Sequence, residues 1–117
     1  MRHLNSKTIF SRPKGEREMM LRNLASSVII DEKVKTTATK AKVVRSLVEK
    51  IITISKKGDL NARRRVISLL PQKNAVKKSF EVLSKRYADR PSGFTCLTKL
   101  QNRQGDGAPI IQIELIQ

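Results

Sequence analysis

Residues 34–53 read V-K-T-T-A-T-K-A-K-V-V-R-S-L-V-E-K-I-I-T, and this stretch decides the fold. Its first four residues, 34–37, are rich in β-branched side chains, which favours a short extended segment. Thr37 or Thr39 then offers a hydroxyl that can cap a helix by accepting a hydrogen bond from a free backbone N–H. We therefore predict a short strand that passes directly into a helix.

The rest of the stretch has apolar residues at helical spacing, namely Ala41, Val44, Leu47, Val48, Ile51 and Ile52. The opposite face carries mostly charged side chains, namely Lys40, Lys42, Arg45, Glu49 and Lys50. Burial of the apolar stripe in a core therefore displays cations on the outside. Gly58 predicts the end of the helix, because glycine readily adopts the left-handed conformation that closes one.

Net charge narrows the class of partner. The chain has 117 residues, with 25 Lys and Arg against 10 Asp and Glu, and its formal charge is +15. Such an excess repels itself in isolation, and binding to a polyanion relieves the repulsion. Nucleic acid is the commonest polyanion, and an anionic membrane surface is the second candidate. The length predicts one domain, whose core is aliphatic because only 3% of the residues are aromatic.

The first fifteen residues differ from the rest in being basic and almost without apolar side chains. They carry five basic side chains and no acid: Arg2, His3, Lys7, Arg12 and Lys14. Burial here is too small to offset the chain entropy of folding. We predict a basic arm over residues 1–15, ordered on its partner and held to the domain by Ile9 and Phe10. A frayed terminus is the alternative, and residues 16–117 form the single α+β domain.

Three more helices are predicted around the central one. The first covers residues 16–30. Another begins at Asp59, a good N-cap, and stops before Pro71, and it turns three exposed arginines outward: Arg63, Arg64 and Arg65. The last covers about 74–87.

After Gly93 the apolar pattern changes to period two, which predicts strands over 94–101 and 110–116. The intervening Gly-rich loop makes them an antiparallel hairpin. Ile111, Ile113 and Leu115 form the inward face of the second strand, and Cys96 is interpreted as a small core residue of the first. Residues 34–37 can supply a third strand. The predicted fold is therefore a two-layer α+β domain with the order helix, short strand, three helices and β-hairpin, preceded by the basic arm.

Motifs of catalysis and cofactor binding are absent from the sequence. There is no G-x-x-x-x-G-K-[ST], G-x-G-x-x-G, C-x-x-C or H-E-x-x-H. Asp31 and Glu32 are the one adjacent acid pair, and a turn explains them better than a catalytic dyad. A single cysteine excludes an intramolecular disulfide. No apolar run approaches the roughly 20 residues of a membrane span. We predict no enzyme activity, no cofactor, no metal and no small-molecule substrate.

Few aromatic side chains are available for stacking on bases, namely Phe10, Phe80, Tyr87 and Phe94. Contacts to the phosphates and 2′-hydroxyls of a structured RNA are therefore favoured over single-strand stacking. Two alternatives belong to other classes. A DNA-compacting or regulatory protein would bind duplex DNA as well as structured RNA, and a basic membrane-surface protein would bind anionic vesicles.

Motifs along nearly the whole chain resemble the bacterial-type large-subunit ribosomal protein seventeen family. The matching residues are Met1-Arg2-His3, Arg12, Arg17, 20–24, Val34-x-Thr36-Thr37-x-x-Lys40-Ala41-Lys42, Arg63-Arg64, Arg90-x-x-Gly93-Phe94-Thr95, Arg103-x-Gly105-Asp106-x-Ala108 and Ile113-Glu114-Leu115. Glu16 and Cys96 depart from the family pattern. The resemblance implies an α+β fold and a structural, non-catalytic role. It also implies binding to large-subunit ribosomal RNA near the polypeptide exit side, among neighbouring ribosomal proteins.

The residues expected to contact RNA combine charge with motif position. They are Arg2, His3, Lys7, Arg12, Lys14, Arg17, Arg22, Lys35, Thr36, Thr37, Lys40, Lys42, Arg63, Arg64, Arg90, Lys99 and Arg103. A cytoplasmic ribosome is the expected location, with an organellar ribosome as the alternative, and no membrane partner is expected.

Overall fold

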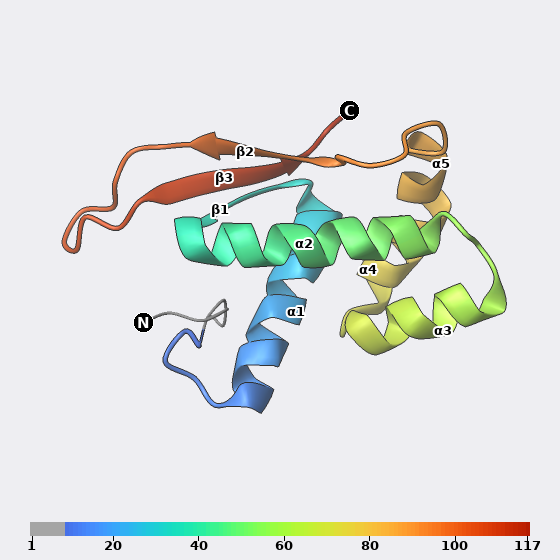
Figure 1. Ribbon diagram of the computed structural model, residues 1–117, viewed down its shortest axis with the longest axis horizontal. Coiled ribbons are helices and arrows are strands. Elements are labelled where there is room, and N and C mark those ends of the chain that lie inside the picture. The colour runs from blue at the N-terminus through green and yellow to red at the C-terminus, as the bar shows by residue number, and fades with distance from the viewer. Residues whose placement is uncertain (1–8) are drawn as a thin grey trace, which may run out of the picture.

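The computed structural model describes residues 9–117 and confirms the α+β class (Figure 1). The elements follow in the order α1 (Lys14–Asp31), β1 (Lys33–Thr37), α2 (Ala38–Ser55), α3 (Leu60–Leu69), α4 (Lys73–Lys78), η1 (Ser79–Leu83), α5 (Ser84–Arg86), β2 (Thr95–Lys99) and β3 (Ile110–Leu115). The sheet forms one layer and the helices lie against one of its faces (Figure 1).

Helix α2 lies at the centre of this packing. It runs beneath the sheet and also contacts α1 and α3 (Figure 1). Its predicted apolar stripe is buried, with Val44, Val48, Ile51 and Ile52 all 0% exposed. Full burial of an aliphatic side chain contributes about 1.5–3 kcal/mol, so this stripe is a main source of stability.

The two ends of α2 form in different ways. Thr37, one of the two predicted candidates, does occupy the N-cap position, but its side chain makes no capping hydrogen bond, so the prediction of that bond is wrong. The chain enters the helix directly from a paired strand, and the Ala38 N–H donates instead to the Pro109 carbonyl at 3.1 Å. At the other end Gly58 has φ of +69°, as predicted for a residue that closes a helix.

The sheet is antiparallel with β3 in the middle, in the order β1-β3-β2. Residues 34–37 therefore do supply a third strand, and Val34 pairs with Ile113. The inward residues of β3 are buried as predicted: Ile111, Ile113 and Leu115. The hairpin prediction is thus confirmed, and the third strand pairs along the side of β3 that β2 leaves free.

Cys96 is exposed, so its interpretation as a core residue is wrong. Phe94 and Thr95 are both buried, one after the other, which shifts the inward phase of β2 by one residue. Cys96 consequently lies opposite Glu114 on the face of the sheet that turns away from the helices. The buried Thr95 hydroxyl donates to the Glu49 carboxylate of α2 at 3.0 Å, which stabilises this register.

Glu32 joins the end of α1 to two distant parts of the chain. It closes the helix at φ of +63°, and its carbonyl accepts a hydrogen bond from the Leu115 N–H at 2.9 Å. Its carboxylate accepts two hydrogen bonds from Arg86, at 2.9 and 3.1 Å, and pairs with Lys78 at 2.9 Å. Arg86 first and Lys78 second lower the pKa of Glu32 to about 2. The acid pair thus closes a turn, as predicted.

The third and fourth predicted helices are also present. The Asp59 carboxylate accepts from the Ala62 N–H at 2.7 Å, as expected of an N-cap. The last predicted helix is continuous over α4, η1 and α5, and its middle turn is π-helical at Ser79–Leu83. The buried Tyr87 ring then lies 5.0 Å from the Phe94 ring, between centroids, and links this helix to the start of β2.

The start of α1 lies two residues before the predicted boundary, at Lys14. Pro13 precedes it, and the Pro13 carbonyl accepts from the Arg17 N–H at 2.9 Å. Ile9 is 59% exposed, so its predicted role in holding the arm to the domain is wrong; Phe10 is half-buried. The division into an arm and a domain stays a prediction, because residues 1–8 lie outside the described part.

Candidate nucleic-acid interface

Three predicted lysines from three elements line two adjoining hollows where the hairpin loop leaves the sheet. Lys35 comes from β1, Lys42 from α2 and Lys99 from β2, and two adjoining hollows share Lys99. Figure 1 shows the loop between β2 and β3 projecting past the N-terminal end of α2 at this place. We call these three lysines, with Gln101 and Asn102, the hairpin-base surface.

The hairpin-base surface is exposed and carries only positive charge. Lys35, Lys42 and Lys99 are all exposed, and none of them makes an ion pair within residues 9–117. Gln101 and Asn102, which were not predicted as site residues, also line these hollows. Their sequence signal is weak, since polar residues after a strand usually mark only a loop. Together these side chains offer charge for phosphates and amide groups for hydroxyls.

Arg103 lies farther out on the hairpin loop and is already paired. Its guanidinium donates to the Asp106 carboxylate at 2.6 and 3.2 Å, and the Ala108 N–H donates to the same carboxylate at 3.1 Å. The Arg103 guanidinium, with the Ala108 N–H, lowers the pKa of Asp106 to about 2. Within this structure Arg103 therefore shapes the loop, and its contact with RNA stays a prediction.

A second group of predicted cations lies along the first half of α1 and just before it. Lys14 is exposed, whereas Arg12, Arg17 and Arg22 are half-buried. The Arg12 guanidinium donates to the Phe10 carbonyl at 3.2 Å. In Figure 1 this end of α1 lies on the side of α2 away from the sheet. The group is therefore separate from the hairpin-base surface.

The strand-to-helix motif contributes partly buried residues. Thr36 and Thr37 pair with Ile111 and Ile110 in the sheet, and both side chains are half-buried. Lys40 is half-buried too and lies outside the hollows that Lys42 lines. Two residues along a helix are separated by roughly 200°, so Lys40 and Lys42 point to different sides.

The remaining predicted cations are spread over the far end of the molecule. Arg63 and Arg64 are both exposed on α3, but the Arg63 guanidinium lies over the Phe80 ring at 4.7 Å. Arg90 is exposed in the turn before β2, and its carbonyl accepts a hydrogen bond from Lys56. Arg2, His3 and Lys7 lie outside the described residues. Among the predicted cations of residues 9–117, three thus lie at the hairpin base, four lie along the first half of α1 or just before it, and the rest are dispersed.

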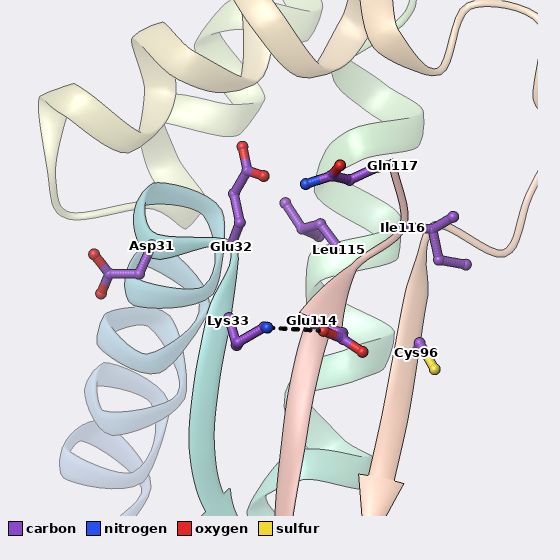
Figure 2. Close-up of a pocket in the computed structure, with 8 residues that line it drawn as sticks. All are labelled: Asp31, Glu32, Lys33, Cys96, Glu114, Leu115, Ile116 and Gln117. Carbon is purple, nitrogen blue, oxygen red and sulfur yellow. Dashed lines mark ion pairs between the residues drawn. The ribbon is translucent and has the colours of Figure 1, made fainter.

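The hollow with the most acidic lining does not resemble a catalytic or metal site. Figure 2 shows it between the end of α1, the start of β2 and the end of β3, with Glu114 paired to Lys33 at 3.8 Å and Asp31 turned away. Glu32 stays ionised there, since its pKa is lowered to about 2. Among residues 9–117 no cluster of three metal-ligating side chains occurs, and no helix is long and apolar enough to cross a bilayer.

Comparisons with known proteins all find the same family, over all or most of the chain. The family model described as "Ribosomal protein L17" matches residues 20–116. A protein named large ribosomal subunit protein bL17 from Dehalococcoides mccartyi is 46% identical over 117 residues, which covers all of both chains. Its namesake from Syntrophotalea carbinolica is 43% identical over 117 residues, covering all of this chain and 76% of that protein.

A third protein of the same name, from Clostridium acetobutylicum, is 46% identical over 105 residues, which covers 90% of this chain and 92% of that one. The region that the family model matches, residues 20–116, contains the strand-to-helix motif, α2 and the hairpin. The resemblance predicted from the motifs is confirmed, and with it the expectation of a ribosomal structural protein that is not an enzyme. The chain belongs to the ribosomal protein L17 family.

Proposed function

We propose that this chain is a structural constituent of the large ribosomal subunit, and that it binds large-subunit ribosomal RNA through the hairpin-base surface. The names of its relatives support the assembly, because they are large-subunit proteins. The observation that carries the contact is that Lys35, Lys42 and Lys99, from three elements, line two adjoining hollows with no acid in their lining.

The mechanism is electrostatic. Each lysine that meets a phosphate releases condensed counterions, which favours binding at low salt and makes it salt-dependent. Gln101 and Asn102 add amide groups that can donate to and accept from 2′-hydroxyls, the groups that distinguish RNA from DNA. The sheet and α2 fix the backbone positions of the three lysines, so only their side chains have to become ordered on binding.

Cations on several sides of the molecule suggest that RNA surrounds it. Lys14, Arg17 and Arg22 along α1, and Arg64 on α3, would contact segments of RNA other than the one at the hairpin base. We propose that the chain fills a gap between ribosomal RNA helices, and that the basic arm over residues 1–15 orders within that gap. Neighbouring large-subunit proteins complete its surroundings.

The location follows from the same proposal. The relatives reported above are bacterial proteins, which favours a bacterial-type ribosome over an organellar one. The ribosome is therefore the proposed site of action, and neither a membrane nor a small-molecule substrate is part of it.

Sedimentation of the tagged chain in a cell lysate tests the proposal. We expect it to travel with large subunits at moderate salt and to leave them when the RNA is digested or the salt is raised. A chain that stays at the top of the gradient would contradict the assembly. A chain that follows DNA or membranes would contradict the choice of polyanion.

A further inference from the structure

A groove between α3 and α4 has an apolar floor and a cationic rim. Its cavity volume is about 670 Å³, within the range of sites that take a small ligand or a few side chains. The lining residues come from both helices and the link between them: Arg63, Ile67, Leu70, Pro71, Lys73, Val76, Lys77 and Glu81. None of these residues lies on the hairpin-base surface.

The floor of this groove is aliphatic and partly open to solvent. Leu70 and Val76 are 3% and 7% exposed at its base, and Ile67 is 55% exposed on its wall. Pro71 completes it. Covering the exposed part of this surface with an apolar side chain would contribute about 25 cal/mol per Å².

The rim carries more positive than negative charge. Arg63, Lys73 and Lys77 supply three cations and Glu81 one carboxylate, and none of the four makes an ion pair within residues 9–117. The contact with Phe80 holds the Arg63 guanidinium in place beside the opening. The rim therefore attracts a negatively charged partner with a defined orientation.

These two features together point to a protein partner. A phosphate backbone would satisfy the rim but would leave Ile67 and Pro71 uncovered. An acidic polypeptide segment with an apolar side chain satisfies both, since its carboxylates meet the cations while its apolar side chain fills the floor. We propose that the groove docks such a segment of a neighbouring protein, and this inference rests on the proposed place in the large subunit.

Site-specific photo-crosslinking in purified large subunits tests the docking. The probe is benzoylphenylalanine in place of Ile67, in the groove, with the same probe in place of Val82 as the control. Val82 is also exposed, at 42%, but does not line the groove. We expect the probe at position 67 to label a protein on a peptide that carries carboxylates next to an apolar residue. The probe at 82 should not label that peptide.

A charge-reversal pair of variants then tests the rim. Lys73→Glu with Lys77→Glu should reduce the crosslink from position 67 by about threefold or more, as expected for two surface ion pairs. The matched control, Lys50→Glu with Lys85→Glu, makes the same change in net charge at exposed residues outside the groove and should leave the yield unchanged.

The outcomes separate this inference from the proposed function. If the chain enters large subunits, the crosslink decides the docking alone. A crosslink to ribosomal RNA, to a second copy of the chain or to a peptide without acids would overturn it, and so would the absence of any crosslink. An equal loss of crosslink in both charge-reversal pairs would overturn the role of the rim. Failure of the unsubstituted chain to enter large subunits would overturn the proposed function, and the docking with it.

Discussion

The core around α2 and the hairpin-base surface use the same few elements for opposite purposes. Residues of α2 such as Val48 and Ile51 are fully buried and hold the sheet to the helices. Lys42 of the same helix and Lys99 of the sheet are exposed and make no ion pair in the described chain. The difference predicts that stability and the proposed RNA binding are separable, although α2 contributes to both.

This separation has a physical origin in the two faces of α2. The stability gained from apolar burial comes from the apolar stripe of α2, and the charge on the opposite face does not change it. The cations on that side repel one another in the free protein and are relieved by a polyanion. Substitutions on the two faces should therefore change different measurable quantities, and the predictions below run from the largest effect on stability to the smallest.

The largest effect is expected in the core. Ile51→Ala removes a side chain that is 0% exposed and leaves a cavity, so the free energy of unfolding should fall by about 2–5 kcal/mol. Chemical denaturation of the purified chain measures it. Ile67→Ala, at a position 55% exposed, is the control and should change stability by about 0.5 kcal/mol or less. Equal effects at the two positions would contradict the assignment of the core.

An intermediate effect is expected at Glu32. Glu32→Gln weakens the bonds to Arg86 and Lys78 that join the end of α1 to the last helix, and should cost about 1–2 kcal/mol. Glu18→Gln is the control, because Glu18 is exposed and makes no ion pair within residues 9–117. A cost at Glu32 no larger than at Glu18 would show that the joint contributes nothing.

The pH dependence of the stability of Glu32→Gln tests whether the ionised Glu32 carboxylate stabilises the folded state. The folded-state pKa of Glu32 is lowered from 4.5 to about 2, so the ionised carboxylate stabilises the folded state. That contribution is fully present above pH about 4.5 and is lost as the pH falls through about 2. The gap in stability between the natural chain and Glu32→Gln should shrink over this window. A gap that widens in acid would contradict the account.

The smallest effect on stability is expected in the hairpin loop. Asp106→Asn removes the charge that pairs with Arg103 and weakens the acceptor of the Ala108 N–H. Both side chains of the ion pair are more than half exposed, so global stability should not change measurably. Amide hydrogen exchange at Ala108 should become faster, while exchange at Ile113 in the central strand should stay unchanged. Unchanged exchange at Ala108 would show that the pair does not order the loop.

The sequence was sufficient for the core because its signals are local. The stripe from Ala41 to Ile52 and the alternation of Ile111, Ile113 and Leu115 each lie within one element and need no knowledge of the partner. Cys96 was predicted on the wrong face because the consecutive residues Phe94 and Thr95 are both buried. A strict alternation of inward and outward residues does not allow for two buried neighbours.

The long-range features could not be predicted in the same way. Glu32 meets Arg86 across 54 positions of sequence. The hairpin-base lysines line adjoining hollows only because β1 and β2 both pair with β3 and α2 packs against this sheet. The charge of each lysine was evident from the sequence, but a charged helix face is usually only a solvated one. Their placement around adjoining hollows depends on how the strands and α2 pack, which the hydrophobic pattern did not reveal.

The central claim is that the hairpin-base surface contacts ribosomal RNA, and the salt dependence of binding tests it most directly. The triple variant Lys35→Gln, Lys42→Gln and Lys99→Gln is compared with Lys50→Gln, Lys57→Gln and Lys85→Gln, which removes equal charge from exposed residues elsewhere. Binding of each full chain to purified large-subunit RNA is measured over a range of salt.

If the three lysines each neutralise a phosphate, the slope of log K against log salt should be shallower by about 2–3 in the first variant, and nearly unchanged in the second. Both proteins should keep the stability of the natural chain. The same slope in both triple variants would contradict the claim, and would mean that the hairpin base is a solvated face.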